Sequence, residues 1–418
     1  MKTVFKVLAS GMMLMAFAVA PAFAQQQEEC EALYKKYMDN YKGPAIAQRK
    51  TAVEAGEQYI AKCASLDAEI TKYLEKAIPP IKKKIDFEES AAAFDVSVKD
   101  AKNVNADVAF TSGKRLLTNH DPNMIDVMLV LASVGFDKAV AKPPVDTYNA
   151  DAINFARQAI QKIEGGTASK QFGAWGYTYK TKENALAWMN YTIGYITYYN
   201  QKNKKDALPY LYKATKYETG GKDNPKNNAL IYQAIGDYYR DEYNRLDDER
   251  AKLATDAKDK TPEEVKVLAD KSKELLLLQK GYADRMIDAY GRAYGLAADQ
   301  TYKTGLLGDL KVLYTFRYDN KPPAALETYI SGLNGKPMPD PTSTVTPVVD
   351  TTTTATTTPA STGTLTKTTT APTTGSTTNG RTSMTETTSV KEPTTTTTKA
   401  KTAKTPAKTP APKKKGTR

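Results

Sequence analysis

Histidine, cysteine and long apolar runs are scarce in this sequence of 418 residues, and each scarcity excludes a class of site. The one histidine, His120, lies in a turn between predicted helices, which leaves no material for histidine-based zinc sites or Ser-His-Asp arrangements. No Gly-rich phosphate loop with its lysine is present. We therefore expect no catalytic residue, no metal and no cofactor, although a pair of buried acids of the glycosidase type stays open.

The apolar run at the start of the chain has the form of a secretory leader. Two lysines flank its start, Val7–Ala20 is almost wholly apolar, and Ala22-Phe23-Ala24 supplies small residues for cleavage. About fourteen apolar residues are too few to cross a bilayer about 30 Å thick. We expect residues 1–24 to be removed and the mature protein to be exported, periplasmic or secreted, without a transmembrane segment; an uncleaved anchor is the alternative.

Large apolar side chains are almost absent from the last part of the chain. From Pro341 onward, threonine makes up about four residues in ten, and such a segment cannot bury enough surface to offset the entropy of ordering it. We expect residues 338–418 to be a disordered, extended tail. The folded domain would then end at residue 337, and truncation at Asp340 would leave its melting temperature unchanged.

The basic character of the chain belongs to this tail. The net charge is +12, of which two lysines lie in the leader and a surplus of eight lies after Pro341, so the folded part carries about +2. Lys413, Lys414 and Lys415 suit polyanions, because flexible lysines neutralise charge without fixed geometry. After export we expect such a partner to be an anionic envelope polymer and not nucleic acid; a solvated spacer without a partner is the alternative.

The body between leader and tail shows helical periodicity and no convincing strands. Apolar residues from Ala152 to Ile163 recur at spacings of three and four, which places them on one side of a helix. The run Thr261-Pro262-Glu263-Glu264 has the form of a helix start, with Thr261 as N-cap and Glu264 able to reach back to it. The body is therefore predicted to be all-α.

Two motifs in these helices resemble the tetratricopeptide repeat family. The first helix of such a repeat carries an aromatic residue, an apolar-glycine pair and a tyrosine, as in Tyr232, Ile235, Gly236 and Tyr239, and Ile193-Gly194 is a second such pair. The second helix carries a small, a bulky and a small residue, a pattern followed by Ala207, Leu211 and Ala214, by Met286, Tyr290 and Ala293, by Ala325, Tyr329 and Gly332, and, with a small central residue, by Ala152, Ala156 and Ala159. Small side chains let paired helices touch, and bulky ones fill the space toward the next pair.

This resemblance implies a right-handed superhelical solenoid of about six antiparallel helix pairs within residues 25–337. The pairs are expected near Glu28–Cys63, Ile81–Thr118, Pro122–Ile163, Thr181–Tyr217, Pro225–Ala297 and Gln300–Leu333. A further helix, Asp67–Ile78, is expected between the first two pairs. A non-repetitive helical domain is the alternative.

One of these pairs is longer than the family pattern requires. Asn244–Lys258 and Thr261–Lys280 are charged and helical, with apolar residues at near-heptad intervals, and they predict an antiparallel arm over about residues 240–282. At 1.5 Å per residue such an arm would project by roughly 25–30 Å. The arm would serve docking or dimerisation, unless it folds back on the body.

The richest candidate surface is aromatic. Members of the family bind extended peptides along a concave face lined by the first helix of each pair, so the resemblance implies a partner groove there. Its predicted lining is Trp188, Tyr191, Tyr195, Tyr198, Gln233, Asp237 and Arg240. Tyrosine suits such a surface because it combines rigid area with a hydroxyl group. Core packing between repeats is the alternative for these rings.

The two cysteines, Cys30 and Cys63, lie near the ends of the first predicted pair. The start of the first helix and the end of the second lie at one end of an antiparallel pair, and an exported chain meets oxidising conditions. We therefore expect these cysteines to form a disulfide.

Together these features favour an exported, non-enzymatic scaffold or adaptor. Its groove and arm would bind proteins or peptides, while its tail would contact anionic envelope surfaces. The alternative is a glycan or cell-wall polymer binding module in which the aromatic rings stack on sugars.

Overall fold

The computed structural model describes residues 24–169, 171–218, 224–318, 324–333 and 335–348. Within these ranges every regular element is a helix, so the chain is all-α, as predicted. A helix over residues 24–40 is followed by α2 (Ile46–Cys63), α3 (Ala68–Val98), α4 (Ala106–Asn119), α5 (Ile125–Ala139), α6 (Asn149–Glu164), α7 (Lys182–Tyr195), α8 (Lys204–Ala214), α9 (Ala229–Asp256), α10 (Pro262–Leu296), α11 (Gln300–Arg317) and α12 (Ala324–Ser331). The short turns between them are η1 (Asp146–Tyr148), η2 (Trp175–Tyr177), the π-helical η3 (Ile196–Asn200) and η4 (Pro225–Asn227).

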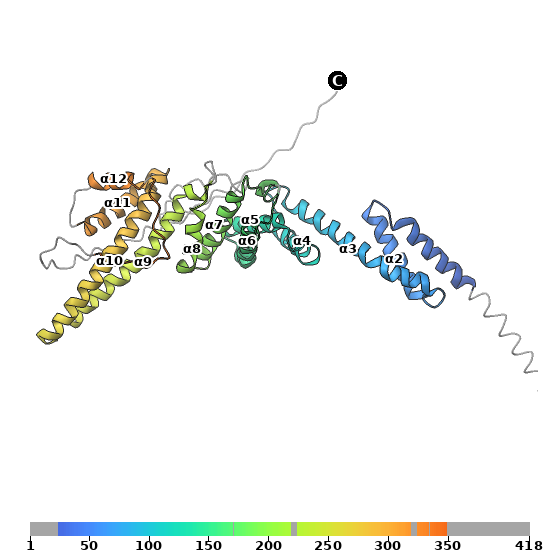
Figure 1. Ribbon diagram of the computed structural model, residues 1–418, viewed down its shortest axis with the longest axis horizontal. Coiled ribbons are helices and arrows are strands. Elements are labelled where there is room, and N and C mark those ends of the chain that lie inside the picture. The colour runs from blue at the N-terminus through green and yellow to red at the C-terminus, as the bar shows by residue number, and fades with distance from the viewer. Residues whose placement is uncertain (1–23, 170, 219–223, 319–323, 334, 349–418) are drawn as a thin grey trace, which may run out of the picture.

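The helices follow one another along the length of an elongated molecule and bury two hydrophobic cores (Figure 1). The small N-terminal core lies between helix 24–40, α2 and the first half of α3. The large core begins at the second half of α3 and continues through α11 and α12 to the end of the described chain. Helix α3 belongs to both, because Leu74 and Ile78 lie in the first core and Phe94 and Val98 in the second.

The continuity of α3 corrects the prediction of a separate helix ending at Ile78. Pro79 and Pro80 lie inside α3, which runs through them for 31 residues. Each proline removes a backbone hydrogen bond, but both lie on the exposed side of the helix, as do Glu75 and Lys76 one turn earlier. Water can therefore solvate the carbonyl groups that lose their partners, and the helix persists.

A charged side chain in the middle of α3 holds the C-terminal end of α4. Asp86 forms an ion pair with Arg115, and its other oxygen lies 2.7 Å from His120 Nε2. Asn119 donates a further hydrogen bond to Asp86 at 3.3 Å. Burial alone would raise the pKa of the Asp86 carboxyl, but these hydrogen bonds outweigh it and hold the pKa below its ordinary value.

The lowered pKa of Asp86 predicts a loss of stability in acid. A carboxyl with a lowered pKa in the folded state stabilises the fold above its ordinary pKa, near 3.8, and this contribution disappears as the pH falls through the lowered value. Asp86→Asn should therefore flatten the decrease in the free energy of unfolding between about pH 5 and pH 2. Asp259→Asn, which removes a charge at an exposed position, is the control for urea titrations across this range; equal slopes for both variants would contradict the prediction.

The predicted arm is present as the far half of α9 and α10. The two helices pack against each other and project beyond the neighbouring helices, at the lower left of Figure 1. Thr261 caps α10, accepting a hydrogen bond from the Glu264 N–H while Glu264 accepts one from the Thr261 N–H, which confirms the predicted helix start. Within the arm the side chain of Gln279 is fully buried and accepts a hydrogen bond from Arg250 at 2.8 Å.

A segment beyond α12 packs on the body, contrary to the expected domain boundary at residue 337. We call residues 337–348 the C-terminal strap. Met338, Pro341 and Val345 are buried in it, the first and last within the large core. The expectation that the tail begins at residue 338 is wrong. These three side chains supply apolar surface for burial, although the tail as a whole contains few large apolar residues. Residues 349–418 lie outside the described residues.

Hydrogen bonds attach the strap to α8 and α10. Tyr212 donates to the Met338 carbonyl at 3.2 Å, Arg285 donates to Ser343 Oγ at 2.9 Å, and the Val348 N–H donates to the Leu277 carbonyl at 3.0 Å. The strap also approaches the α10 backbone closely. A Cβ atom at Gly281 would lie 2.4 Å from the Thr346 carbonyl oxygen, so only glycine leaves room there.

Gly281→Ala should therefore destabilise the protein and loosen the strap, although alanine favours a helix by about 1 kcal/mol over glycine. We expect a net loss of about 1–2 kcal/mol in urea unfolding, since backbone must move to admit the methyl group. Thermolysin should also cleave faster beside Met338. Gly295→Ala, in the same helix but with no atom near its would-be Cβ, is the matched control and should stabilise; equal gains in both variants would show that the strap does not press on α10.

Truncation gives a second test of the strap. A chain ending at residue 348 should unfold like the full chain, whereas one ending at residue 336 loses the three buried side chains and their hydrogen bonds. We expect the shorter chain to lose about 2–3 kcal/mol after the entropy of ordering the strap is subtracted. Thermal unfolding of the two chains, followed by circular dichroism, measures this difference. Identical melting transitions would show that the folded domain ends at residue 337.

Candidate binding site

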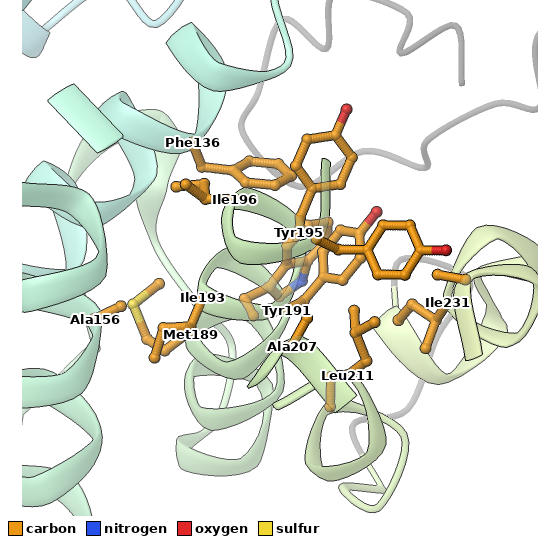
Figure 2. Close-up of a cluster of buried hydrophobic side chains, with 14 of the residues drawn as sticks. Phe136, Ala156, Met189, Tyr191, Ile193, Tyr195, Ile196, Ala207, Leu211 and Ile231 are labelled. Atoms are coloured by element: carbon orange, nitrogen blue, oxygen red, sulfur yellow. The ribbon is translucent and has the colours of Figure 1, made fainter. Parts of the chain in front are cut away.

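The four aromatic residues predicted to line a groove are buried in the large core. Trp188, Tyr191, Tyr195 and Tyr198 are between 1% and 6% exposed. Phe136 of α5 lies against three of these rings, with centroids 5.4 Å from Tyr195, 5.5 Å from Tyr191 and 6.3 Å from Trp188. Figure 2 shows Tyr191 and Tyr195 enclosed by side chains of α5, α7, α8 and α9.

This burial corrects the prediction of an aromatic groove in favour of its alternative, core packing. Helix α7 has no exposed side after its first three residues, because every residue from Ala185 to Tyr195 is buried. Asn228 donates a hydrogen bond to the Tyr191 hydroxyl at 3.1 Å. Burial raises the pKa of Tyr191, and it raises the pKa of Tyr195 to about 12, so both phenols stay neutral.

Two of the three polar residues predicted for the same groove, Gln233 and Asp237, join α9 to neighbouring helices, and the third, Arg240, pairs with Asp237 within α9. Asp237 Oδ1 accepts a hydrogen bond from Tyr290 of α10 at 2.8 Å and lies 2.8 Å from Arg240 Nη2. Gln233 accepts a hydrogen bond from Tyr302 of α11 at 2.9 Å. Burial raises the pKa of Asp237, while Arg240 and Tyr290 oppose the shift. Gln233 and Arg240 are buried and the Asp237 side chain is 19% exposed, so these residues offer a partner little surface.

A cavity of about 700 Å³ lies on another side of the molecule, between α8, α9, α10 and the strap. Its wall contains four tyrosines, of which Tyr239 is buried and Tyr210, Tyr238 and Tyr282 are half-buried. Residues 341–345 of the strap form the opposite wall. The exposed side chains Arg157, Gln201, Asn203 and Lys205 form its rim.

Tyr239 lies at the inner wall of this cavity, but its hydroxyl oxygen is enclosed by protein and does not face the open space. The Tyr239 hydroxyl is buried and makes no hydrogen bond within the described part of the chain, and its side chain is 1% exposed. The Tyr239 and Tyr282 rings meet edge to face with centroids 6.2 Å apart, and the Arg157 guanidinium lies 5.6 Å from the Tyr210 ring centre. The cavity therefore combines rigid aromatic faces with hydrogen-bonding groups at its rim.

Sequence reasoning did not nominate this cavity. Tyr239 was assigned to the repeat motif, and the strap that completes the cavity was assigned to the tail. Gly281 was the available signal, because a glycine inside a charged helix often marks close approach of another backbone.

The other predicted sites lie elsewhere. Cys30 and Cys63 are joined by a disulfide, with Cα atoms 5.9 Å apart, beside the N-terminal core. Lys413, Lys414 and Lys415 lie outside the described residues, as does the leader up to residue 23.

The described residues contain neither a metal site nor a membrane-spanning helix. No group of three or more histidine, cysteine, aspartate or glutamate side chains among them is placed to hold a metal ion. None of the helices in these ranges is both long and apolar enough to cross a membrane.

No protein family, curated protein or solved structure matches the chain.

Proposed function

We propose that this chain is an exported, non-enzymatic scaffold built on a tetratricopeptide-like, right-handed solenoid of six antiparallel helix pairs. The support comes from close contacts at the glycines that carry the resemblance. A Cβ atom at Gly194 of α7 would lie 2.7 Å from Leu211 of α8, and one at Gly236 of α9 would lie 2.4 Å from Tyr290 of α10. Each contact joins the apolar-glycine pair of one helix to the bulky residue of the next, as the family pattern requires.

The same kind of contact occurs in the preceding helices. A Cβ atom at Gly135 of α5 would lie 2.5 Å from Ala152 of α6, the first small residue of that pattern. Three consecutive pairs of helices therefore approach through glycine. A solenoid of such pairs presents long surfaces to partners and needs no catalytic group.

The arm is the element best suited to hold a protein partner. It projects from the body, and Val265 and Val267 on α10 are 37% and 67% exposed. Exposed apolar side chains on a projecting, charged helical hairpin provide both area and specificity for docking. The arm therefore replaces the buried rings of α7 as the proposed protein-binding surface.

A photo-crosslinking amino acid at Val267 tests this role of the arm in cells that export the full chain. We expect it to give specific protein adducts. The matched control is the same substitution at Val312 of α11, which is 51% exposed but lies away from the arm. No adducts at position 267, or the same adducts from both positions, would exclude the arm as the docking element.

The tail is proposed to contact anionic envelope polymers by charge alone. Replacement of Lys413, Lys414 and Lys415 by glutamine should reduce sedimentation with cell envelopes at low salt and leave it unchanged at high salt. Equal salt dependence in the full chain and in a chain ending at residue 348 would show that the tail has no part in this association.

A further inference from the structure

We propose that the tyrosine-walled cavity between α8, α9, α10 and the strap is a binding site for a saccharide. This goes beyond the scaffold role and is independent of it. It also places a glycan function at a site other than the α7 rings, which are buried. The shape of the cavity and the chemistry of its wall support this proposal.

The cavity has the size and the exposure that a small ligand needs. Its volume of about 700 Å³ lies within the range of roughly 300–1,000 Å³ usual for small-molecule sites. The inner wall is buried at Tyr239, Pro341 and Val345, whereas the rim is exposed at Gln201 and Lys205. A ligand can therefore enter from solvent and reach side chains that are largely desolvated.

The wall chemistry matches the two kinds of surface on a sugar ring. A pyranose has apolar C–H faces that pack on aromatic rings and an edge of hydroxyl groups that both donate and accept hydrogen bonds. Tyr238 and Tyr282 offer half-buried rings, while Gln201 and Arg157 offer donors at the rim.

An extended peptide fits this cavity less well. The strap already occupies the contacts for an extended chain on α8 and α10, through its carbonyl of Met338 and its N–H of Val348. The remaining wall belongs largely to helices, whose backbone groups are paired within the helix. Recognition there depends on side chains, which suits a compact polyhydroxylated ligand.

The test is calorimetric titration of chitotetraose, a neutral N-acetylglucosamine oligomer, into the full mature chain. We expect saturable binding, at least tenfold weaker in Tyr282→Ala and within twofold of wild type in Tyr294→Ala. Tyr294 lies on the same helix α10, is half-buried like Tyr282 and does not line the cavity. Circular dichroism of each variant checks that the helices persist.

A second variant guards against loss of folding in the first. Gln201→Ala removes a hydrogen-bond donor at the exposed rim, so it should weaken binding about fivefold to tenfold without lowering stability. A uronic acid oligomer in place of chitotetraose shows whether Arg157 and Lys205 select a carboxylated sugar. Absence of saturable binding by both oligomers, or equal affinity in wild type, Tyr282→Ala and Gln201→Ala, would overturn the saccharide site.

Discussion

Replacing Tyr191 with alanine is expected to lower the free energy of unfolding by about 3–5 kcal/mol, the loss usual for a large aromatic side chain in a packed core. Tyr191 is 1% exposed and lies among the rings of Phe136, Trp188 and Tyr195 at centroid distances between 5.5 and 5.9 Å. Removal of its ring leaves a cavity that α5 and α7 cannot fill. Urea unfolding followed by circular dichroism measures the loss.

A conservative variant separates packing from hydrogen bonding at this position. Tyr191→Phe keeps the ring and loses the hydrogen bond from Asn228, so it should cost only about 1 kcal/mol. Unchanged stability of Tyr191→Ala would place the ring outside the core and revive the aromatic groove. Because Tyr191 lies in the core, a loss of partner binding in Tyr191→Ala would result from unfolding and would not show a direct contact.

Removal of the disulfide should have a comparable effect on the N-terminal core alone. Cys30 and Cys63 are 33 residues apart in the chain, and closing such a loop contributes roughly 3–4 kcal/mol in the chain-entropy model. The N-terminal core is small, and α3 connects it to the remaining helices. We expect the double variant Cys30→Ser with Cys63→Ser to show fast hydrogen exchange in helix 24–40 and α2 while α5 to α10 stay protected.

Reduction of the wild-type protein supplies the comparison. After full reduction, the wild-type protein should show the same hydrogen-exchange rates as the double variant. Reductant should not change the hydrogen-exchange rates of the double variant. Both sulfur-bearing side chains are buried, at 4% and 0% exposure, so native reduction should be slow. Two free thiols in the native protein, detected by alkylation under denaturing conditions, would contradict the disulfide.

The strap and the α7 rings show where sequence reasoning reached its limit. Threonine and proline dominate the strap as they dominate the tail, and nothing local distinguishes Met338 or Val345 from isolated apolar residues. Their burial depends on α10, which leaves room at Gly281 more than fifty residues earlier in the chain. In α7 the apolar residues occupy every side of the helix, so periodicity could not say which rings face a neighbour and which face solvent.

The sequence by itself determined the all-α class, the start of α10 and the two helices of the arm. These features depend on interactions within a few residues, such as the bonds between Thr261 and Glu264 and the spacing of apolar side chains along one helix. Only the tertiary structure decided that Tyr191 and Tyr195 lie in the core, that the fold extends to residue 348, and that a tyrosine-walled cavity forms beside the strap. Each of these depends on which distant segment covers a surface, and that is settled by packing between helices far apart in the chain.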